Sequence, residues 1–445
     1  MVGCRRTVDG TTPPPRPGVC RYARCFTRNR AGGAPLTAAP VAPGGLSRVL
    51  GSFSVPGFRR LWTAAVLFAL GQWMERVAIG WFVLDVTGSV FLTAASVSAR
   101  SAPGILLGPV AGAVSDRYPR GRVLAITATC NALIMLTVAA LVFADRVSIG
   151  AILVLVALSG CAMTFSLASL TAFAGDVVGP ERRPNAISLM SVGQRAVGAA
   201  GALGGGVLIA TIGPGLTFLL AAVPLAGAAL TYAGIPSGLR TAARSSTSFL
   251  ADVVGGLQAV LRIPIVALLL AMMVLVEIVG FSFQSLMPVV AEQVLNVGAA
   301  GLGGLVGATS VGSMLGTIVL AVVSDRGRQG LLLVGVFAVF GVMLAALGVS
   351  NIYAVSLLAA CGVGAAAAIV DALEWILLQK HVPDHLRGRV LGAWGVAIGF
   401  GWVGPLILGA VADRAGTQVA LVGAGAILVS AAAVIGARAR SLRTA

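Results

Sequence analysis

Charged and metal-binding side chains are scarce in this sequence. Only 10% of its 445 residues are Asp, Glu, Lys or Arg, and histidine occurs twice. A soluble domain has about 25% charged residues, so water is not the solvent that this composition predicts. The six cysteines form no Cys-x-x-Cys pair, and three of them lie in apolar segments. Neither a disulfide framework nor a zinc site is therefore indicated.

Signatures of catalysis are missing as well. The sequence contains no Gly-x-x-x-x-Gly-Lys phosphate-binding loop and no catalytic triad pattern. His381 and His385 are four residues apart with only Asp384 nearby, and two ligands do not make a metal site. We therefore expect no enzyme activity, no cofactor and no bound metal, and we expect any transport to be driven by a gradient rather than by ATP.

Long apolar segments fill most of the chain. Hydrophobic residues make up 58% of it, and apolar runs recur after residue 60. A helix of about 20 such residues crosses a hydrocarbon core of roughly 30 Å. The runs are continuous rather than alternating, which excludes a β-barrel. The sequence predicts an all-α membrane protein whose twelve transmembrane helices cover 61–84, 91–114, 122–143, 148–174, 186–210, 215–235, 264–290, 300–323, 330–349, 352–378, 390–412 and 417–437.

One long polar connection divides these helices into two groups of six. The N-terminal region is rich in Arg, Pro and Gly and has no apolar run, so we expect it to be disordered. The predicted parts are a basic tail (1–58), a six-helix bundle (59–235), a linker (236–262), a second six-helix bundle (263–437) and a short basic tail (438–445).

The distribution of Lys and Arg predicts the orientation. With these helices, 26 of the 31 Lys and Arg residues fall on the side that holds both tails and the linker. Basic loops face the cytoplasm, so both termini are predicted to be cytoplasmic, in the inner membrane. The net charge of +16 is then mostly this bias, so we expect no nucleic-acid partner. We also expect a monomer, with the lipid bilayer, a small-molecule substrate and protons as its partners.

A Ser-Asp-Arg step recurs after the second and the eighth predicted helix, which argues for duplication of a six-helix unit. The copies are Gly112-Ala-Val-Ser-Asp116-Arg117, followed by Arg120 and Arg122, and Ala321-Val-Val-Ser-Asp325-Arg326-Gly-Arg328. The first copy resembles the loop motif of the major facilitator superfamily, except that Pro119 and Gly121 depart from it. Further phrases resemble the branch of that superfamily that holds enterobactin exporters and drug-efflux proteins: 58–62, 87–89, Pro103, 287–288 and 387–390.

The resemblance implies that this loop acts as a latch. In the family the Asp meets the positive end of a helix in the other half, and the Args bind an acid at the end of helix four, where Asp176 stands. Separation of the halves would break these contacts. The alternative is that the loop only fixes topology. Because the second copy lacks the leading glycine, we expect changes at Asp116 to damage transport more than changes at Asp325.

Small residues form a second motif, in the fifth and eleventh predicted helices. Gly198 and Gly201 stand where antiporters of the superfamily carry a glycine-rich motif, and Gly404-Pro405 has the Gly-Pro step of that motif in the other half. Close helix packing by small residues is the interpretation that we favour.

Ionisable residues deep in the predicted helices are more informative, because each costs at least roughly 2.5–3.5 kcal/mol at mid-bilayer unless it is paired or solvated. They are Glu75, Arg76, Arg100, Arg195, Glu277 and Asp371, with Gln72 one turn before Arg76 and Glu374 one turn after Asp371. The resemblance implies that helices one, four, seven and ten line a central cavity, which brings Glu75, Glu277 and Asp371 near the substrate.

These acids are candidates for carrying protons, with Glu277 the first choice. Burial disfavours a charged carboxylate and an approaching Arg favours it, so a conformational change can switch protonation. Static ion pairs between helices are the alternative, above all for Arg100 and Arg195. The sequence thus predicts a secondary active transporter that exports small amphipathic molecules, drug-like or siderophore-like, in exchange for protons. A nutrient or metabolite importer of the same fold and a non-transporting membrane protein remain alternatives.

Overall fold

The computed structural model describes residues 51–179, 181–236, 263–323, 328–383 and 386–438. All of them belong to one compact unit, Gly45–Ala445. Every regular element in these ranges is helical, which confirms the predicted all-α membrane protein.

The elements before the linker are η1 (Gly51–Ser54), α2 (Pro56–Thr87), α3 (Val90–Ser101), α4 (Pro103–Arg117), α5 (Arg120–Phe143), α6 (Ile149–Val178) and α7 (Arg183–Ala233). We call them the first half. The second half contains α9 (Pro264–Leu275), η2 (Val276–Gly280), η3 (Phe281–Ser285), α10 (Met287–Val289), η4 (Val290–Val294), α11 (Gly298–Val323), α12 (Gln329–Val349), α13 (Tyr353–His381), α14 (Arg387–Gly399), η7 (Phe400–Trp402), α15 (Val403–Ala415) and α16 (Thr417–Arg438).

Eleven helical segments of the described chain are long and apolar enough to cross a membrane, one fewer than the sequence predicts. The difference lies in α7, whose 51 residues include both predicted helices 186–210 and 215–235. Gly213 interrupts it with a left-handed φ of 80°, and Pro214 follows. A straight helix of that length would measure about 77 Å, more than twice the thickness of a hydrocarbon core of roughly 30 Å. We therefore interpret α7 as two crossings that meet at Gly213.

Other boundaries differ from the prediction for local reasons. The predicted helix 91–114 is divided into α3 and α4 just before Pro103, which cannot donate a backbone hydrogen bond. The predicted helix 264–290 is divided into α9, η2, η3 and α10, of which η2 is π-helical and η3 is 3-10. Of the predicted tail 1–58, the described residues 51–58 are mostly helical, in η1 and the start of α2.

Capping residues set several helix ends. Gly88, with φ 62°, ends α2 in the left-handed conformation that glycine adopts without strain. Ser89 then begins α3, because its hydroxyl accepts a hydrogen bond from the Leu92 amide at 3.2 Å. Ser148 begins α6 in the same way by accepting from the Ala151 amide at 3.3 Å. The short connections after α2 and after α5 therefore place α2 beside α3, and α5 beside α6, as antiparallel neighbours.

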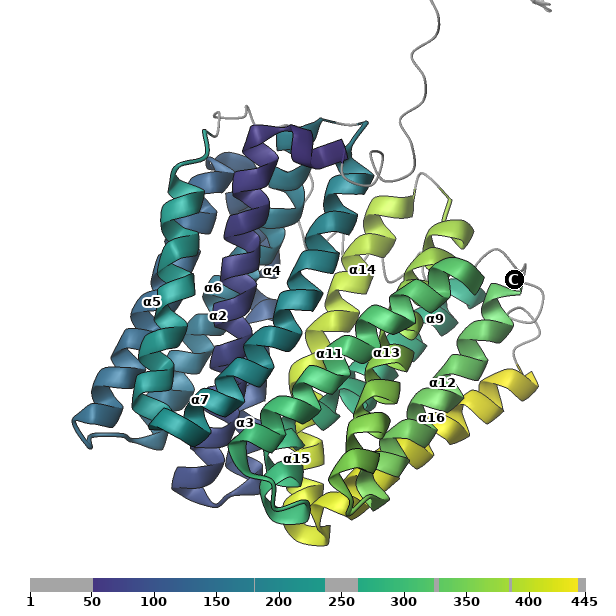
Figure 1. The fold of residues 1–445 in the computed structure, drawn as a ribbon. Helices are drawn as coiled ribbons and strands as arrows, with labels where there is room; N and C mark the ends of the chain where they lie inside the picture. The colour runs from purple at the N-terminus through teal and green to yellow at the C-terminus, as the bar shows by residue number, and fades with distance from the viewer. Residues whose placement is uncertain (1–50, 180, 237–262, 324–327, 384–385, 439–445) are drawn as a thin grey trace, which may run out of the picture. The chain divides into compact units, whose positions relative to one another are not determined.

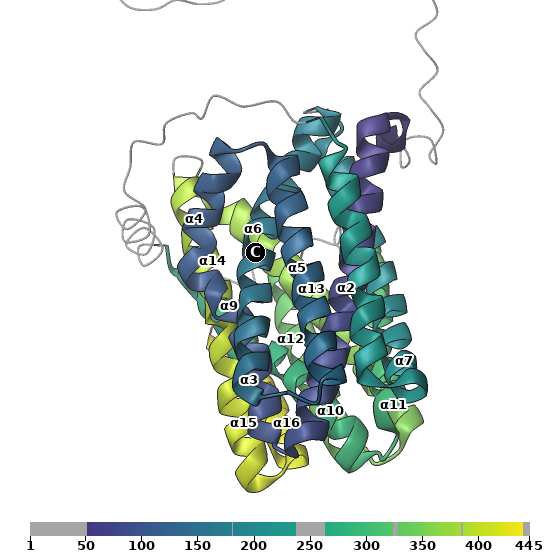
Figure 2. The ribbon, with the colours of Figure 1, turned by 90° about the vertical axis from the view of Figure 1, so that its left-hand side faces the viewer.

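The two halves lie beside each other and meet along two helix pairs (Figure 1). Within the first half α7 packs against α2 and α5, and within the second half α11 packs against α13 and α12 against α16. Between the halves α7 packs against α11, and α3 packs against α15 (Figures 1 and 2). These two pairs flank the space between the halves.

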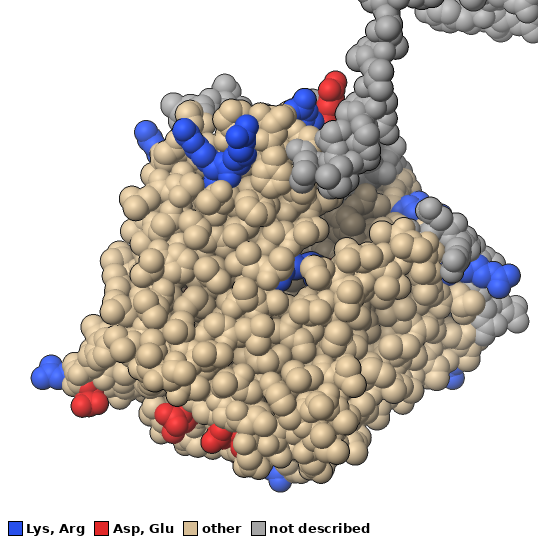
Figure 3. All heavy atoms as spheres, in the orientation of Figure 1, with Lys and Arg blue, Asp and Glu red and all other residues tan. Residues whose placement is uncertain are grey.

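Charge divides the ends of the helices. Arg117, Arg120 and Arg183 lie where α4 ends and where α5 and α7 begin, and we call this side the basic end. Asp85 and Asp145 lie at the opposite end, near the last residues of α2 and α5. In Figure 3 most blue atoms gather along the upper edge and most red atoms along the lower edge.

Candidate functional site

A cavity of about 1090 Å³ lies between the two halves and is lined by both of them. Its first-half lining includes Trp73, Arg76, Arg100 and Arg195. Its second-half lining comes from the irregular segment after α9 and from α11, α13, α14 and α15, and includes Glu277, Phe281 and Gln284 among others. The lining thus combines aromatic surface with a few charged groups near the middle of the helices, as binding sites for small molecules commonly do.

The cavity extends toward the basic end. Its lining includes Gly108, two turns before Arg117 at the end of α4, and Thr171, in the last turns of α6. The face shown in Figure 3 is hollowed, with blue atoms in the hollow.

At the opposite end the halves are in close contact through glycines. A Cβ atom on Gly206 of α7 would lie 2.8 Å from Gly303 Cα of α11, and one on Gly409 of α15 would lie 2.5 Å from the Ala94 Cβ of α3. A Cβ atom on Gly80 of α2 would lie 3.1 Å from the ring of Pro288. Helices approach this closely only where side chains are small, so these contacts close the cavity at this end.

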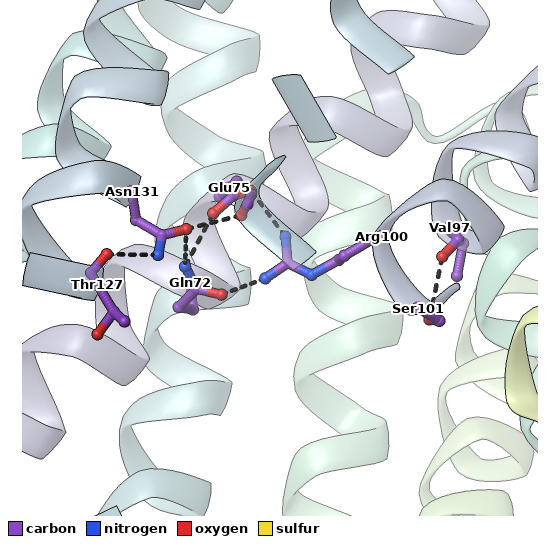
Figure 4. A network of polar contacts seen from close by, with 8 residues as sticks. Gln72, Glu75, Val97, Arg100, Ser101, Thr127 and Asn131 are labelled. Carbon is purple, nitrogen blue, oxygen red and sulfur yellow. Dashed lines mark hydrogen bonds and ion pairs between the residues drawn. The ribbon is translucent and has the colours of Figure 1, made fainter. Parts of the chain in front are cut away.

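A buried polar network ties four helices of the first half together (Figure 4). Arg100 of α3 donates from Nη1 to Glu75 Oε1 of α2 at 2.7 Å and from Nη2 to Gln72 Oε1. Gln72 Nε2 donates to Glu75 Oε2 at 3.0 Å and to Asn131 Oδ1 of α5 at 3.0 Å. The Ser159 hydroxyl of α6 lies 2.7 Å from both Glu75 Oε1 and Asn131 Oδ1.

This network holds Glu75 away from the cavity. The Glu75 side chain is 0% exposed, and both of its oxygens accept hydrogen bonds. Buried charges are tolerated when they are paired and hydrogen-bonded, as here. Arg100 lines the cavity with its other surface. Glu75 and Arg100 are therefore joined as an ion pair between α2 and α3 in this conformation.

Arg76, the residue after Glu75, points into the cavity. It is exposed although it lies in the middle of α2. Its guanidinium stacks on the Trp73 ring, 4.6 Å from the centroid, and donates from Nη1 to Gln284 Oε1 of the second half at 3.1 Å. This hydrogen bond joins the two halves across the cavity.

The acids of the second half have few partners. Glu277 lines the cavity from the π-helical turn η2, and Glu374 of α13 is fully buried. Within the described ranges, neither carboxylate oxygen of Glu374 has a hydrogen-bond partner. Asp371 and Glu277 lie close enough to act electrostatically on Glu374, and Arg195 of α7 acts on Asp371. Three acids from two elements and one base from the other half are therefore gathered beside the cavity.

The small residues singled out in the sequence pack helices together. Gly198 and Gly201 lie against α2, where Cβ atoms would approach Trp73 Nε1 at 2.7 Å and Leu70 O at 2.9 Å. Gly404 lies against Ile278 O and the Ser282 hydroxyl, and Pro405 after it lines the cavity. Gly198 thus leaves room for the indole on which Arg76 stacks.

The first loop motif forms contacts within its own half. Arg120 donates to Asp176 at 2.5 Å and to Asp116 at 3.2 Å. Asp116 is 68% exposed, Arg117 and Arg122 are exposed, and Gly112 is half-buried on α4. In the second copy Arg328 is exposed just before α12, whereas Asp325 and Arg326 lie outside the described residues, as do His385 and most of the linker.

Sequence analysis named Gln72 but missed three other neutral members of the site. Asn131 and Ser159 complete the network around Glu75, and Gln284 is the partner of Arg76. Asn131 and Ser159 are fully buried inside apolar helices, and a buried amide in such a helix is the signal that could have marked Asn131.

Membrane-crossing helices in two packed halves, with a large cavity between them, are the architecture of a multi-pass membrane transporter, and the match to a family model places the chain among transporters rather than enzymes. The chain belongs to the Major Facilitator Superfamily, whose family model matches residues 61–405. The resemblance recognised in the loop motif is thereby confirmed.

Similar proteins include an efflux pump and a siderophore exporter. The chain is 28% identical over 378 residues to the multidrug efflux pump Tap of Mycolicibacterium fortuitum, an alignment that covers 79% of this chain and 88% of that protein. It is 25% identical over 366 residues to the enterobactin exporter EntS of Shigella boydii, covering 79% and 85%. Among solved structures, the nucleoside transporter NupG has the same fold, with a TM-score of 0.70, 13% identity and coverage of 86% and 99%.

Proposed function

We propose that the protein is a secondary active transporter that exports small amphipathic molecules from the cytoplasm by alternating access, in exchange for protons. The observation that carries this proposal is the cavity, which both halves line, which extends to the basic end and which glycine contacts close at the opposite end. If the basic end is cytoplasmic, as basic loops favour, the cavity is open to the cytoplasm, from which an exporter collects its cargo.

The proposal of export also draws on the relatives. Tap is a multidrug efflux pump and EntS an enterobactin exporter, and each aligns with most of this chain. The aromatic surface that Trp73, Phe281 and Phe283 contribute to the cavity suits a cargo with an apolar body.

Proton exchange is supported by the acids of the second half. Glu277 lines the cavity on an irregular turn, and Glu374 lies behind it without a hydrogen-bond partner among the described residues. Keeping a charge on such a buried carboxylate is costly, so proton binding is the way to relieve it. Release of that proton requires a change of surroundings, which the rocking of the halves supplies.

The test is transport in proteoliposomes with an imposed pH gradient, using a panel of amphipathic dyes and protein-free liposomes as the blank. We expect dye to enter vesicles with an acidic lumen, and a protonophore to abolish this uptake. Glu277→Gln should remove the effect of the gradient, whereas Asp413→Asn, at the end of α15, should keep it. Uptake that requires an acidic exterior would instead support the importer. Gradient-driven flux in Glu277→Gln would exclude Glu277 as the proton carrier.

Orientation has a separate test. Tyr118 is 60% exposed beside the loop motif. In intact cells a cysteine replacing Tyr118, in a background without other cysteines, should react with a membrane-impermeant maleimide only after the membrane is permeabilised. Labelling in intact cells would place the basic end outside and reverse the proposed direction.

A further inference from the structure

We propose that the cavity selects anionic cargo, with Arg76 as the residue that binds the anionic group. The inference rests on the proposed transport function and adds to it the charge of the molecule carried. It starts from the charges that line the cavity, which are Arg76, Arg100, Arg195 and Glu277.

Two of the three guanidinium groups already have acidic neighbours. Arg100 forms the ion pair with Glu75 at 2.7 Å, and Arg195 acts electrostatically on Asp371 of α13. Glu374 lies within electrostatic range of both Glu277 and Asp371. Arg100 is therefore paired within the protein, and Arg195 has Asp371 within electrostatic range.

Arg76 forms no ion pair with any of the described residues. The ion pairs of the described residues join Arg100 to Glu75 and Arg120 to Asp116 and Asp176, and none includes Arg76. Glu75 and Arg100 are the charged residues that act on Arg76, and their own charges cancel in the network. Arg76 thus brings to the cavity, at mid-membrane, a guanidinium without an ion-pair partner among the described residues, and such a charge is expensive to keep.

The surroundings of Arg76 suit an anion with an aromatic or apolar body. A guanidinium has five N–H donors, and the described structure uses one of them, toward Gln284 Oε1 at 3.1 Å. The remaining donors form a planar fork that matches a carboxylate in two parallel hydrogen bonds. Trp73 holds the guanidinium from one side at 4.6 Å, and Phe281 and Phe283 supply apolar surface in the same cavity.

Gln284 gives this site a connection to the opposite half. Its amide oxygen satisfies one Arg76 donor in the structure described, and an arriving carboxylate competes for that donor. Binding of the anion would then loosen a contact between the halves, whereas a cation would be repelled by Arg76. The same residue therefore selects the cargo and senses its arrival.

The experiment measures binding rather than transport. The full chain in nanodiscs of neutral phosphatidylcholine is equilibrated by dialysis with three probes that share one ring system: 1-naphthoate, 1-naphthalenemethanol and 1-naphthylmethylammonium. Empty nanodiscs give the blank. We expect naphthoate to bind at least about 10-fold more tightly than the alcohol, in keeping with a charge-assisted hydrogen bond, and the ammonium to bind most weakly.

Two variants test the role of Arg76. Arg76→Gln should lower naphthoate affinity about 10- to 100-fold and leave the alcohol within about 2-fold, which also shows that the cavity is intact. Gln284→Glu keeps the guanidinium but gives it an acidic partner, and should abolish the preference for the anion. Arg146→Gln, in the exposed loop after α5, is the matched control and should bind all three probes like the wild type.

The proposal is overturned if the wild type binds naphthoate no better than the alcohol, including failure to bind either, or if Arg76→Gln keeps the preference. The experiments distinguish failure of this inference from failure of the proposed transport function. Anion binding without gradient-driven flux would contradict the transport proposal alone. Gradient-driven export of cationic dyes without naphthoate binding would contradict this inference alone.

Discussion

Glu75 and Arg76 are consecutive residues of α2 with opposite surroundings. Glu75 is fully buried and accepts hydrogen bonds from Gln72, Arg100 and Ser159. Arg76 is exposed in the cavity and contacts Trp73 and Gln284. One step of about 100° around a helix separates a structural charge from a charge available to a ligand.

The ion pair between Arg100 and Glu75 predicts a large effect on stability. Arg100→Leu leaves Glu75 buried without its cation, and breaking such a pair costs about 3–5 kcal/mol. Thermal unfolding in detergent should therefore occur at a lower temperature in Arg100→Leu than in the wild type. Adding Glu75→Gln should restore part of the loss, because it removes the uncompensated charge. Equal melting temperatures for wild type and Arg100→Leu would show that the pair does not stabilise the protein.

Glu374 offers a second test of proton exchange, independent of Glu277. Since its oxygens have no hydrogen-bond partner among the described residues, Glu374→Gln should leave the melting temperature near that of the wild type. In proteoliposomes we expect it to reduce uptake driven by a pH gradient at least about 10-fold, since proton transfer groups commonly contribute that much or more. Exchange of dye across a membrane without a gradient should continue. Unchanged gradient-driven uptake would remove Glu374 from the proton path.

The loop motif predicts a non-additive pair. Arg120 holds both Asp116 and Asp176, so Arg120→Gln and Asp176→Asn should lower initial transport rates similarly, and the double variant little further. Asp116→Asn should slow transport more than Asp325→Asn. Initial rates in proteoliposomes, normalised to reconstituted protein, provide the measurement. A larger effect at Asp325 would contradict the unequal roles predicted for the two copies.

Gly206 tests the closure of the cavity. A larger side chain there meets the backbone of Gly303, so Gly206→Val should separate α7 from α11 at the end opposite the basic one. A cysteine replacing Val306, which lines the cavity, reports this opening through its reaction with an impermeant maleimide added from that side. We expect faster labelling in Gly206→Val than in a Gly204→Val control, because a Cβ atom on Gly204 meets nothing within 4 Å. Equal rates would mean that the glycine contact does not close the cavity.

The helices were predictable because hydropathy and length determine which segments cross a membrane. The break at Gly213 shows the limit of this approach: hydropathy predicts two helices there, but not that they follow each other through a single glycine with φ 80°. The irregular turns between α9 and α11 were not predicted either, because the segment Pro264–Val294 contains a stretch long and apolar enough to be taken for one continuous helix.

The charged members of the site were predictable from the cost of placing them in a membrane. Their pairing was not, because Arg100 could have met any of several acids, and tertiary packing brings it to Glu75. The roles of Asn131, Ser159 and Gln284 were not predictable either, since an amide in an apolar helix can mark a residue but only the folded structure shows which groups it contacts.

The network around Glu75 also has a mechanical consequence. It fastens α2, α3, α5 and α6 to one another at mid-depth, whereas the second half contains the π-helical and 3-10 turns η2 and η3 at the same depth. We therefore expect the first half to rotate as a stiff body and the second half to bend within itself, so that the bending occurs in the half that carries Glu277 and Glu374.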